Sequence, residues 1–298
     1  MQIGIVGLGK MGLNLALNLA DQQYDVVGYD LDEAVVNATH HDNMKTVGSL
    51  KEFVNTLSGQ KIIWLMVPAG DVTEATVKEL QPLLTSDDIV IDGGNSNYNR
   101  SVMTGEMLKE SGIHYFDCGT SGGVKGAREG ACLMIGGDKE IFPIIEPIID
   151  TLSLPNGYLY TGDLGSGHFL KMVHNGIEYG MMQAIAEGFE VLHKSPYDYD
   201  FKEVARVFNH GSVVESWLME LMENIFKEDS KLENIRGIMD ATGEGQWTVE
   251  TALDFKVPTP VIALSLMMRY RSLEDDTFSG KVVAALRNQF GGHDVVKR

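Results

Sequence analysis

Cysteines and long apolar runs are what this chain lacks. Cys118 and Cys132 are its only cysteines in 298 residues, too few for a disulfide framework, so we expect a reducing compartment, by default the cytoplasm. No apolar run reaches the roughly 18 residues that a membrane span needs. A strand-like run, Ile3–Val6, begins almost at the first residue, so we expect no signal peptide.

Positive charge is scarce as well. Lysine and arginine number 24 against 42 aspartate and glutamate residues, which gives a formal net charge of -18 at pH 7. This excess argues against nucleic acid or an anionic membrane as a partner. An anionic substrate would need a site that gathers cations against the field of the whole protein. The C-terminal tail is the exception, because after Gly280 only Asp294 opposes four basic residues, Lys281, Arg287, Lys297 and Arg298.

The remaining composition is typical of a globular protein, with 44% hydrophobic and 22% charged residues and a length suited to two ordinary domains or one large one. Over residues 1–165, short apolar segments alternate with helical ones such as Leu13–Ala20 and Val72–Leu84. This alternation favours a mostly parallel sheet with helices on both faces, an α/β fold of the doubly wound, Rossmann type. The predicted strands are Ile3–Val6, Asp25–Asp30, Lys61–Val67, Ile89–Asp92, His114–Gly119 and Ala131–Ile135.

The pattern changes near Asp163–Ser166, where glycines crowd together. A helical stretch without proline runs from Gly167 to about Lys194, and no strand pattern recurs after it. We therefore expect two domains, an α/β domain at residues 1–165 and an all-α C-terminal domain at residues 166–298. Its further predicted helices are Asp200–Asn209, Val213–Phe226, Trp247–Phe255, Val261–Tyr270 and Ser279–Gln289.

A glycine-rich turn, Gly7-Leu8-Gly9-Lys10-Met11-Gly12, joins the first predicted strand to the first helix. In a G-x-G-x-x-G turn the first glycine permits the tight bend, the second lets backbone approach a pyrophosphate, and the third lets helix and strand pack closely. The helix N-terminus then offers N–H groups to the phosphates. The alternative is an ordinary glycine turn, but the strand–turn–helix context favours a dinucleotide-binding domain over residues 1–165.

Asp30 ends the second predicted strand, where an acid can accept hydrogen bonds from the adenosine ribose. A carboxylate there repels a 2′-phosphate, so we expect NAD to be preferred over NADP. Asp32 can share or take over this role, and the alternative is a solvated Asp30-Leu31-Asp32 loop. The residues expected to bind the cofactor are Gly7, Leu8, Gly9, Lys10, Met11, Gly12, Asp30, Val67 and Asn95.

Five polar residues of the long helical stretch share one helix face. Lys171, His174, Asn175, Glu178 and Tyr179 follow the i, i+3, i+4, i+7, i+8 spacing at which a core helix carries Leu, Val or Met. Burial lowers the pKa of a lysine, so Lys171 can accept a proton from an alcohol, and Glu178 can donate one later in the cycle. The spacing therefore favours an acid–base site.

Met172, Val173 and Ile177 occupy the other faces, so we expect the helix to be embedded. A buried polar stripe is costly unless each group finds a partner. The alternative is accordingly a structural Lys171–Glu178 ion pair, with the neighbouring polar side chains capping backbone. The histidines show no convincing ligand spacing with Asp or Cys, so we expect no metal.

Two glycine-rich loops follow the fourth and fifth predicted strands. The first presents Asn95, and the second presents Ser121, Gly122 and Gly123. Loops at the carboxyl ends of strands converge on the ligand crevice of a doubly wound sheet, so these residues are candidates for substrate contact. Ordinary turn chemistry is the alternative for each loop.

With these motifs the sequence resembles the 6-phosphogluconate dehydrogenases over essentially the whole chain. The matching segments are G-L-G-K-M-G at 7–12, I-D-G-G-N-S at 91–96, T-S-G-G at 120–123, G-H-F-L-K-M-V-H-N-G-I-E-Y at 167–179, G-Q-W-T at 245–248 and F-G-G-H at 290–293. The first is shared by many dehydrogenases, whereas the run from Lys171 to Tyr179 is highly specific.

The resemblance implies NAD(P)-dependent oxidation of the C3 hydroxyl of 6-phospho-D-gluconate and loss of the C1 carboxylate as CO2, giving D-ribulose 5-phosphate in the pentose phosphate pathway. Lys171 matches the family's general base, and Glu178 matches its acid. The tail residues match ones that reach a neighbouring subunit, which implies a homodimer or homotetramer built through the helical domain. The substrate-binding positions are Asn95, Ser121, Gly122, Gly123, His174, Asn175, Tyr179, Arg269, Arg287 and His293.

The sequence departs from the family's long form in three ways. Its helical part is a short form, with one helical half instead of two. Tyr29-Asp30-Leu31 replaces the Asn-Arg-Thr that suits NADP, and Thr242 and Glu244 stand where a lysine and a threonine lie near the substrate phosphate. An inward-pointing Glu244 would repel a phosphate dianion.

Two other functions remain as alternatives. One is a β-hydroxyacid dehydrogenase for a small non-phosphorylated acid, which would not need the cations Arg269 and Arg287. The other is a non-catalytic NAD-sensing protein, which would not need the intact pair of Lys171 and Glu178.

Overall fold

The computed structural model describes residues 1–297, and the chain divides into two compact units, Met1–His174 and Asn175–Arg298. The division falls inside one continuous helix, α8 (Ser166–Lys194).

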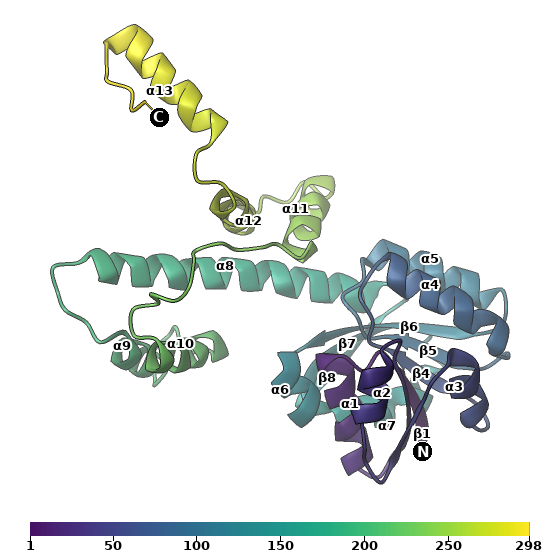
Figure 1. Cartoon of the computed structure of the whole chain (residues 1–298). Helices are drawn as coiled ribbons and strands as arrows, with labels where there is room; N and C mark the ends of the chain where they lie inside the picture. The colour runs from purple at the N-terminus through teal and green to yellow at the C-terminus, as the bar shows by residue number, and fades with distance from the viewer. Residues whose placement is uncertain (298) are drawn as a thin grey trace. The chain divides into compact units, whose positions relative to one another are not determined.

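The first unit is built on an eight-stranded sheet with the order β3-β2-β1-β4-β5-β6-β7-β8 (Figure 1). All neighbouring strands run parallel except β6 and β7, which are antiparallel. The predicted α/β class with a mostly parallel sheet is therefore confirmed. The strands are β1 (Gln2–Val6), β2 (Asp25–Tyr29), β3 (Met44–Val47), β4 (Ile62–Leu65), β5 (Ile89–Asp92), β6 (His114–Ser121), β7 (Ala131–Gly136) and β8 (Ser153–Gly162).

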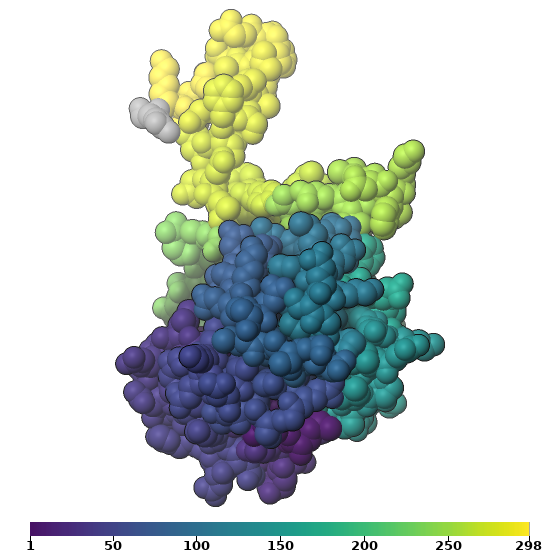
Figure 2. Space-filling model, turned by 90° about the vertical axis from the view of Figure 1, so that its right-hand side faces the viewer, coloured from purple at the N-terminus to yellow at the C-terminus, as the bar shows by residue number. Residues whose placement is uncertain are grey.

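Side-chain alternation along the strands fills a core on each face of the sheet. In β4, Ile62 and Trp64 join the cluster under α1, α6 and α7, whereas Ile63 and Leu65 join the one under α3, α4 and α5. Figure 2 views the molecule from the side of α4 and α5, whose blue atoms form a continuous layer. The helices are α1 (Lys10–Asp21), α2 (Glu33–Ala38), α3 (Leu50–Thr56), α4 (Asp71–Leu80), α5 (Tyr98–Lys109), α6 (Gly123–Glu129) and α7 (Phe142–Leu152).

Two strands were missing from the sequence prediction, and both lie at edges of the sheet. β3 is short and only partly buried, so it lacks the apolar run that marks the inner strands. β8 has no buried residue, contains Pro155, and pairs with β7 through register shifts. The predicted helix Val72–Leu84 also ends early, because Pro82 converts its last turn into a 3-10 segment at Gln81–Leu83.

The described residues of the second unit form helices joined by loops and contain no strand, as predicted. A small aromatic core joins α8, α9 and α10, with the rings of Phe189 and Phe226 stacked 5.4 Å apart. α10 starts four residues later than predicted, because the Ser216 hydroxyl caps it by accepting the Met219 N–H. After α8 come α9 (Phe201–Phe208), α10 (Trp217–Glu228), α11 (Glu244–Asp254), α12 (Pro260–Ser272) and α13 (Phe278–Gly291).

No helix within residues 1–297 combines the length and apolar character needed to cross a bilayer.

Candidate active site

The three glycines between β1 and α1 do different things. Gly7 has φ +92°, and an added Cβ there would lie 2.4 Å from the Met66 carbonyl oxygen. A Cβ on Gly12 would lie 1.8 Å from the Gly7 carbonyl oxygen, so the fold itself excludes side chains at both ends of the turn. A Cβ on Gly9 would meet no protein atom within 4 Å. The middle glycine therefore faces open space that a ligand can approach.

Asp30 is tied to this turn by its carboxylate. Oδ2 accepts the Leu8 N–H at 2.7 Å, and Oδ1 accepts the Asp32 N–H at 2.9 Å. The Asp32 carboxylate instead caps α2 by accepting the Ala34 N–H at 2.9 Å. Asp30 thus shapes the glycine turn while it lines the neighbouring pocket, and Asp32 has a separate structural role.

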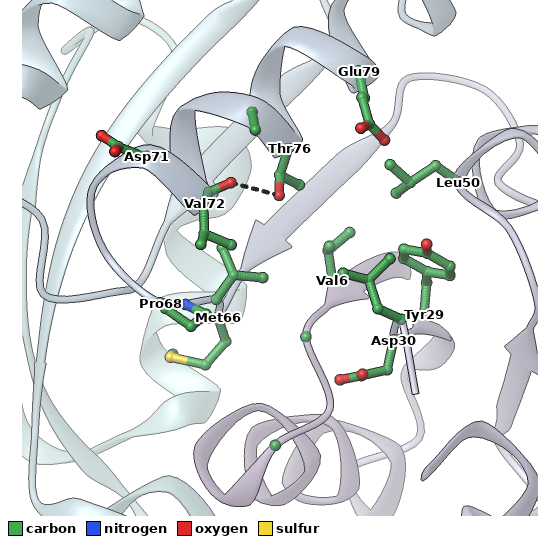
Figure 3. A pocket seen from close by; sticks show the side chains of 15 residues that line it. Val6, Tyr29, Asp30, Leu50, Met66, Pro68, Asp71, Val72, Thr76 and Glu79 are labelled. Atoms are coloured by element: carbon green, nitrogen blue, oxygen red, sulfur yellow. Dashed lines mark hydrogen bonds between the residues drawn. The ribbon is translucent and has the colours of Figure 1, made fainter. Parts of the chain in front are cut away.

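That pocket, of about 470 Å³, lies at the carboxyl ends of β1, β2 and β4. Of the nine predicted cofactor residues, Gly7, Gly9, Asp30 and Val67 line it, whereas Leu8, Lys10, Met11, Gly12 and Asn95 do not. Figure 3 shows the wall that sequence reasoning missed, built from the segment after β4 and from α4. The other lining residues are Val6, Tyr29, Leu31, Leu50, Met66, Pro68, Asp71, Val72, Ala75, Thr76 and Glu79.

The charged residues of the lining are all acidic. Asp30, Asp71 and Glu79 contribute carboxylates, and no lysine, arginine or histidine is found among the residues named for this wall. Burial raises the pKa of the Tyr29 hydroxyl, and the nearby Glu79 and Asp30 add to the effect. Arg100, just outside, pairs with Asp71 at 2.9 Å. The wall is therefore suited to hydroxyl groups and a neutral ring rather than to a phosphate.

A buried carboxylate shapes the loop after β5. Asp92 is 1% exposed and accepts the Gly94 N–H at 3.0 Å, the Ser96 hydroxyl at 2.6 Å and the Tyr115 hydroxyl at 3.0 Å. Asn95 stands exposed between the buried Gly94 and Ser96. The carboxylate therefore fixes a loop that presents the Asn95 amide outward. The signal for it was present in the sequence, as an acid at the end of an apolar strand.

The first two turns of α8 meet β6 at the predicted catalytic position. Lys171 is 6% exposed, and its Cβ packs on Gly119. His174 Nε2 lies 3.3 Å from the Ser121 hydroxyl. Lys171 and His174 of α8 thus lie against β6, where His174 meets Ser121. Gly122 and Gly123 follow at once, with φ values of +121° and +60° that favour glycine.

In the second unit, Tyr179 and Arg269 form a stacked pair, with the guanidinium carbon 3.5 Å from the ring centroid. Arg269 also donates to the Asp240 carbonyl at 3.1 Å, and the Tyr179 hydroxyl accepts the Thr242 N–H at 3.3 Å. Glu244, 3% exposed, accepts the Thr242 hydroxyl at 2.7 Å. Its carboxylate is therefore engaged within its own segment at the start of α11.

The remaining predicted residues are more accessible. Asn175 and Glu178 are half-buried on α8, but Ile177 is 54% exposed, so the expectation that this part of the helix is embedded was wrong. Arg287 and His293 are exposed, and α13 has no buried residue. They meet none of the other predicted site residues in the described hydrogen bonds and ion pairs. Arg298 lies outside the described residues.

No cluster of three or more potential ligands for a metal ion is found among residues 1–297.

The two parts of the chain match two family profiles. Residues 2–162 match the NAD binding domain of 6-phosphogluconate dehydrogenase, and residues 167–295 match the 6-phosphogluconate dehydrogenase C-terminal domain. The resemblance seen in the motifs is thereby confirmed.

Individual proteins agree with the profiles. The protein YqeC of Bacillus subtilis is 56% identical over 298 residues, covering 100% of both chains. The NAD(+)-dependent, decarboxylating 6-phosphogluconate dehydrogenase of Haloferax volcanii is 42% identical over 100% of this chain and 99% of its own length. The Plasmodium falciparum 6-phosphogluconate dehydrogenase, whose cofactor is NADP+, superposes with a TM-score of 0.84 at 29% identity, covering 100% of this chain and 66% of that one.

Proposed function

Because this chain belongs to the 6-phosphogluconate dehydrogenase family, we propose that it oxidises 6-phospho-D-gluconate at C3 and decarboxylates it to D-ribulose 5-phosphate and CO2, with NAD as the preferred acceptor. The observation that carries this proposal is the buried Lys171, seated on Gly119 beside His174 and Ser121. A lysine in such a place is suited to take a proton from a bound alcohol.

The residues divide the reaction between a base and an acid. Lys171 accepts the proton of the C3 hydroxyl, and NAD, when bound by the residues of the glycine turn, would be the hydride acceptor. The resulting β-keto acid loses CO2 readily, and the Asn95 and Asn175 amides stabilise the developing enolate oxygen. Glu178, two turns from Lys171 along the same helix, then protonates the enediol carbon that had carried the carboxylate. Substrate binding is assigned to Asn95, Ser121, Gly122, Gly123, His174, Asn175, Tyr179, Arg269, Arg287 and His293.

The NAD preference is supported by the charges in the nucleotide pocket. Asp30 and Glu79 both line it, and the nearby cation Arg100 is already paired with Asp71. A 2′-phosphate placed here would face carboxylates and no basic residue among those that line the pocket, whereas ribose hydroxyls could donate to them. We therefore assign cofactor contacts to Gly7, Leu8, Gly9, Lys10, Met11, Gly12, Asp30, Val67 and Asn95.

Recognition of the substrate phosphate is assigned to Arg269. Its stacking on Tyr179 and its bond to the Asp240 carbonyl hold the guanidinium plane in place, which leaves further N–H donors for an anion. The Glu244 carboxylate is occupied by the Thr242 hydroxyl, so repulsion of the phosphate is weaker than the sequence alone suggested.

The C-terminal helix supports a shared site in a homodimer or homotetramer. Phe278, Val282, Leu286 and Phe290 recur every four residues on α13 and are 40% to 79% exposed. Such an apolar stripe is typical of a helix that packs on a partner. We propose that α13 packs on a second copy and delivers Arg287 and His293 to that copy's site.

The proposed domains are a dinucleotide-binding domain at residues 1–165 and a substrate and oligomerisation domain at residues 166–298. The cytoplasm is the proposed location, in keeping with the free thiols of Cys118 and Cys132.

A steady-state assay with 6-phosphogluconate, each cofactor in turn, and CO2 detection tests the proposal. The expected result is NADH formation with equimolar CO2 and little turnover of 3-hydroxyisobutyrate. Faster turnover of 3-hydroxyisobutyrate would assign the chain to the small-acid dehydrogenases. NAD binding with no turnover of any hydroxy acid would indicate a sensor.

A further inference from the structure

Asp117 is a fully buried carboxylate that the proposed reaction does not use. It lies on β6, is 0% exposed, and both of its oxygens accept backbone N–H groups at the start of α8. Oδ1 accepts the Gly165 N–H and Oδ2 the His168 N–H, each at 2.6 Å. The first N–H groups of a helix have no acceptor inside the helix, and a negative charge there also complements the helix dipole. Asp117 therefore attaches the first turn of α8 to the sheet.

The same turn is seated closely on neighbouring strands and on α5. A Cβ on Gly167 would lie 2.4 Å from the Met134 carbonyl oxygen and 2.6 Å from that of Asp117. The Ser101 hydroxyl lies 2.7 Å from His168 Nδ1. Hydrogen bonds and backbone contact thus fix both the position and the rotation of the helix start.

Successive residues of β6 then contact successive turns of α8. Asp117, Gly119 and Ser121 are alternate residues of β6, so their side chains share one face of the sheet. His168, Lys171 and His174 meet them in the same order, each one helical turn after the last. A displacement of the first contact is therefore passed on to the second and third.

We propose that Asp117 is a positioning residue of the dehydrogenase: its carboxylate sets the register of α8 on β6 and so places the amine of Lys171 for proton transfer. This role rests on the proposed function of Lys171. Burial raises the pKa of the Asp117 carboxyl, whereas nearby His168 and the hydrogen bonds from backbone lower it. Ionising this carboxyl in the folded protein therefore costs free energy, which a purely apolar anchor would avoid.

The test compares Asp117→Asn with a matched control, Asp88→Asn. Asp88 is also buried, at 1% exposed, and accepts backbone N–H groups of Lys61 and Thr85, but it stands just before β5, at the opposite end of that strand from Asp92, the register partner of Asp117. In Asp117→Asn an amide NH2 would face a backbone N–H, so the helix start must shift. A misplacement near 1 Å can reduce kcat on the order of 10²-fold, so we expect such a loss with little change in NAD affinity. Asp88→Asn should keep the wild-type kcat.

A second measurement does not depend on turnover. The rate at which acetic anhydride labels Lys171, followed by mass spectrometry across pH, should differ from wild type in Asp117→Asn and not in Asp88→Asn. Asp117→Ser, with a smaller side chain, should show the same change if the amide variant does not fold. A wild-type enzyme that turns over no sugar acid would refute the proposed function, while the labelling would still report on Asp117. Equal kcat and equal labelling in the Asp117 and Asp88 variants would overturn the positioning role.

Discussion

Lys171 packs directly on Gly119: a Cβ built on Gly119 would lie 2.3 Å from the lysine Cβ and 2.9 Å from its Cγ. Contacts this short do not occur between real side chains, so any larger residue must push α8 away from β6. The lysine is buried, and its position is set by this contact.

Gly119→Ala should therefore reduce kcat on the order of 10²-fold while NAD binding stays near wild type, because Gly119 does not line the nucleotide pocket. Overpacking of this kind should also lower stability by about 1–3 kcal/mol. Steady-state kinetics and denaturant titration check both effects. Gly48→Ala is the control, since a Cβ there would meet nothing within 4 Å. Full activity in Gly119→Ala would mean that the contact does not place the base.

Lys171→Met should abolish oxidation because the substitution removes the proton acceptor but keeps much of the buried volume. NAD affinity, measured by calorimetry, should stay near wild type. Unchanged turnover in this variant would refute the assignment of Lys171 as the base.

Asp30 tests the cofactor preference. Asp30→Ala should weaken NAD more than NADP, measured as kcat/KM for each, because the ribose acceptor is lost together with the charge that repels a 2′-phosphate. Asp30→Asn separates the two effects, since its amide oxygen can still accept the Leu8 N–H that orders the glycine turn. An equal loss for both cofactors would remove the argument for NAD.

Truncation before Arg287 should abolish activity while the fold survives, as judged by circular dichroism and NAD binding. A mixing experiment shows where the tail acts. Mixed oligomers of Lys171→Met and Arg287→Ala, two variants each inactive alone, should regain activity if one copy's tail completes the other copy's site. No recovery after verified subunit exchange, or an active truncated monomer, would contradict the shared site.

The pH dependence of stability provides a test of Asp117. Its pKa is raised by burial, so the folded protein binds this proton more readily than the unfolded chain, whose aspartate pKa is about 3.9. The contribution of Asp117 to stability should therefore rise as pH falls through the folded-state pKa. The titratable groups around it are Asp92, Tyr115, Cys118 and His168. Denaturant titrations at several pH values should show wild type gaining stability relative to Asp117→Asn as pH falls, and the reverse trend would contradict the prediction.

Much of the fold could be predicted because the inner strands are buried on both faces and appear as unbroken apolar runs. β3 and β8 lack that pattern because edge strands are buried on one side at most. The glycine turn and the polar stripe of α8 were readable from spacing within a few residues. The wall of the nucleotide pocket formed by α4, with Thr76 and Glu79, was not, because it depends on how a distant helix packs on the sheet.

Asp92 and Asp117 show a different limit. Each is an acid at the end of, or within, an apolar strand, which marks it as a candidate, but this position alone does not distinguish a solvated strand end from a buried carboxylate. The two are register partners on β5 and β6, and each organises backbone that carries a candidate site residue. Only the three-dimensional structure assigns them this role.

In the glycine turn, the substitutions that the fold excludes fall at other positions than those that only a bound ligand would exclude. At Gly7 and Gly12 a methyl group would collide with the protein's own backbone, whereas at Gly9 it would meet no neighbour in the chain. Natural or engineered variation at the middle position is therefore restricted only by whatever occupies the space beside it. An alanine found there in a stable relative would indicate a protein that has kept this fold but no longer binds a ligand beside the turn.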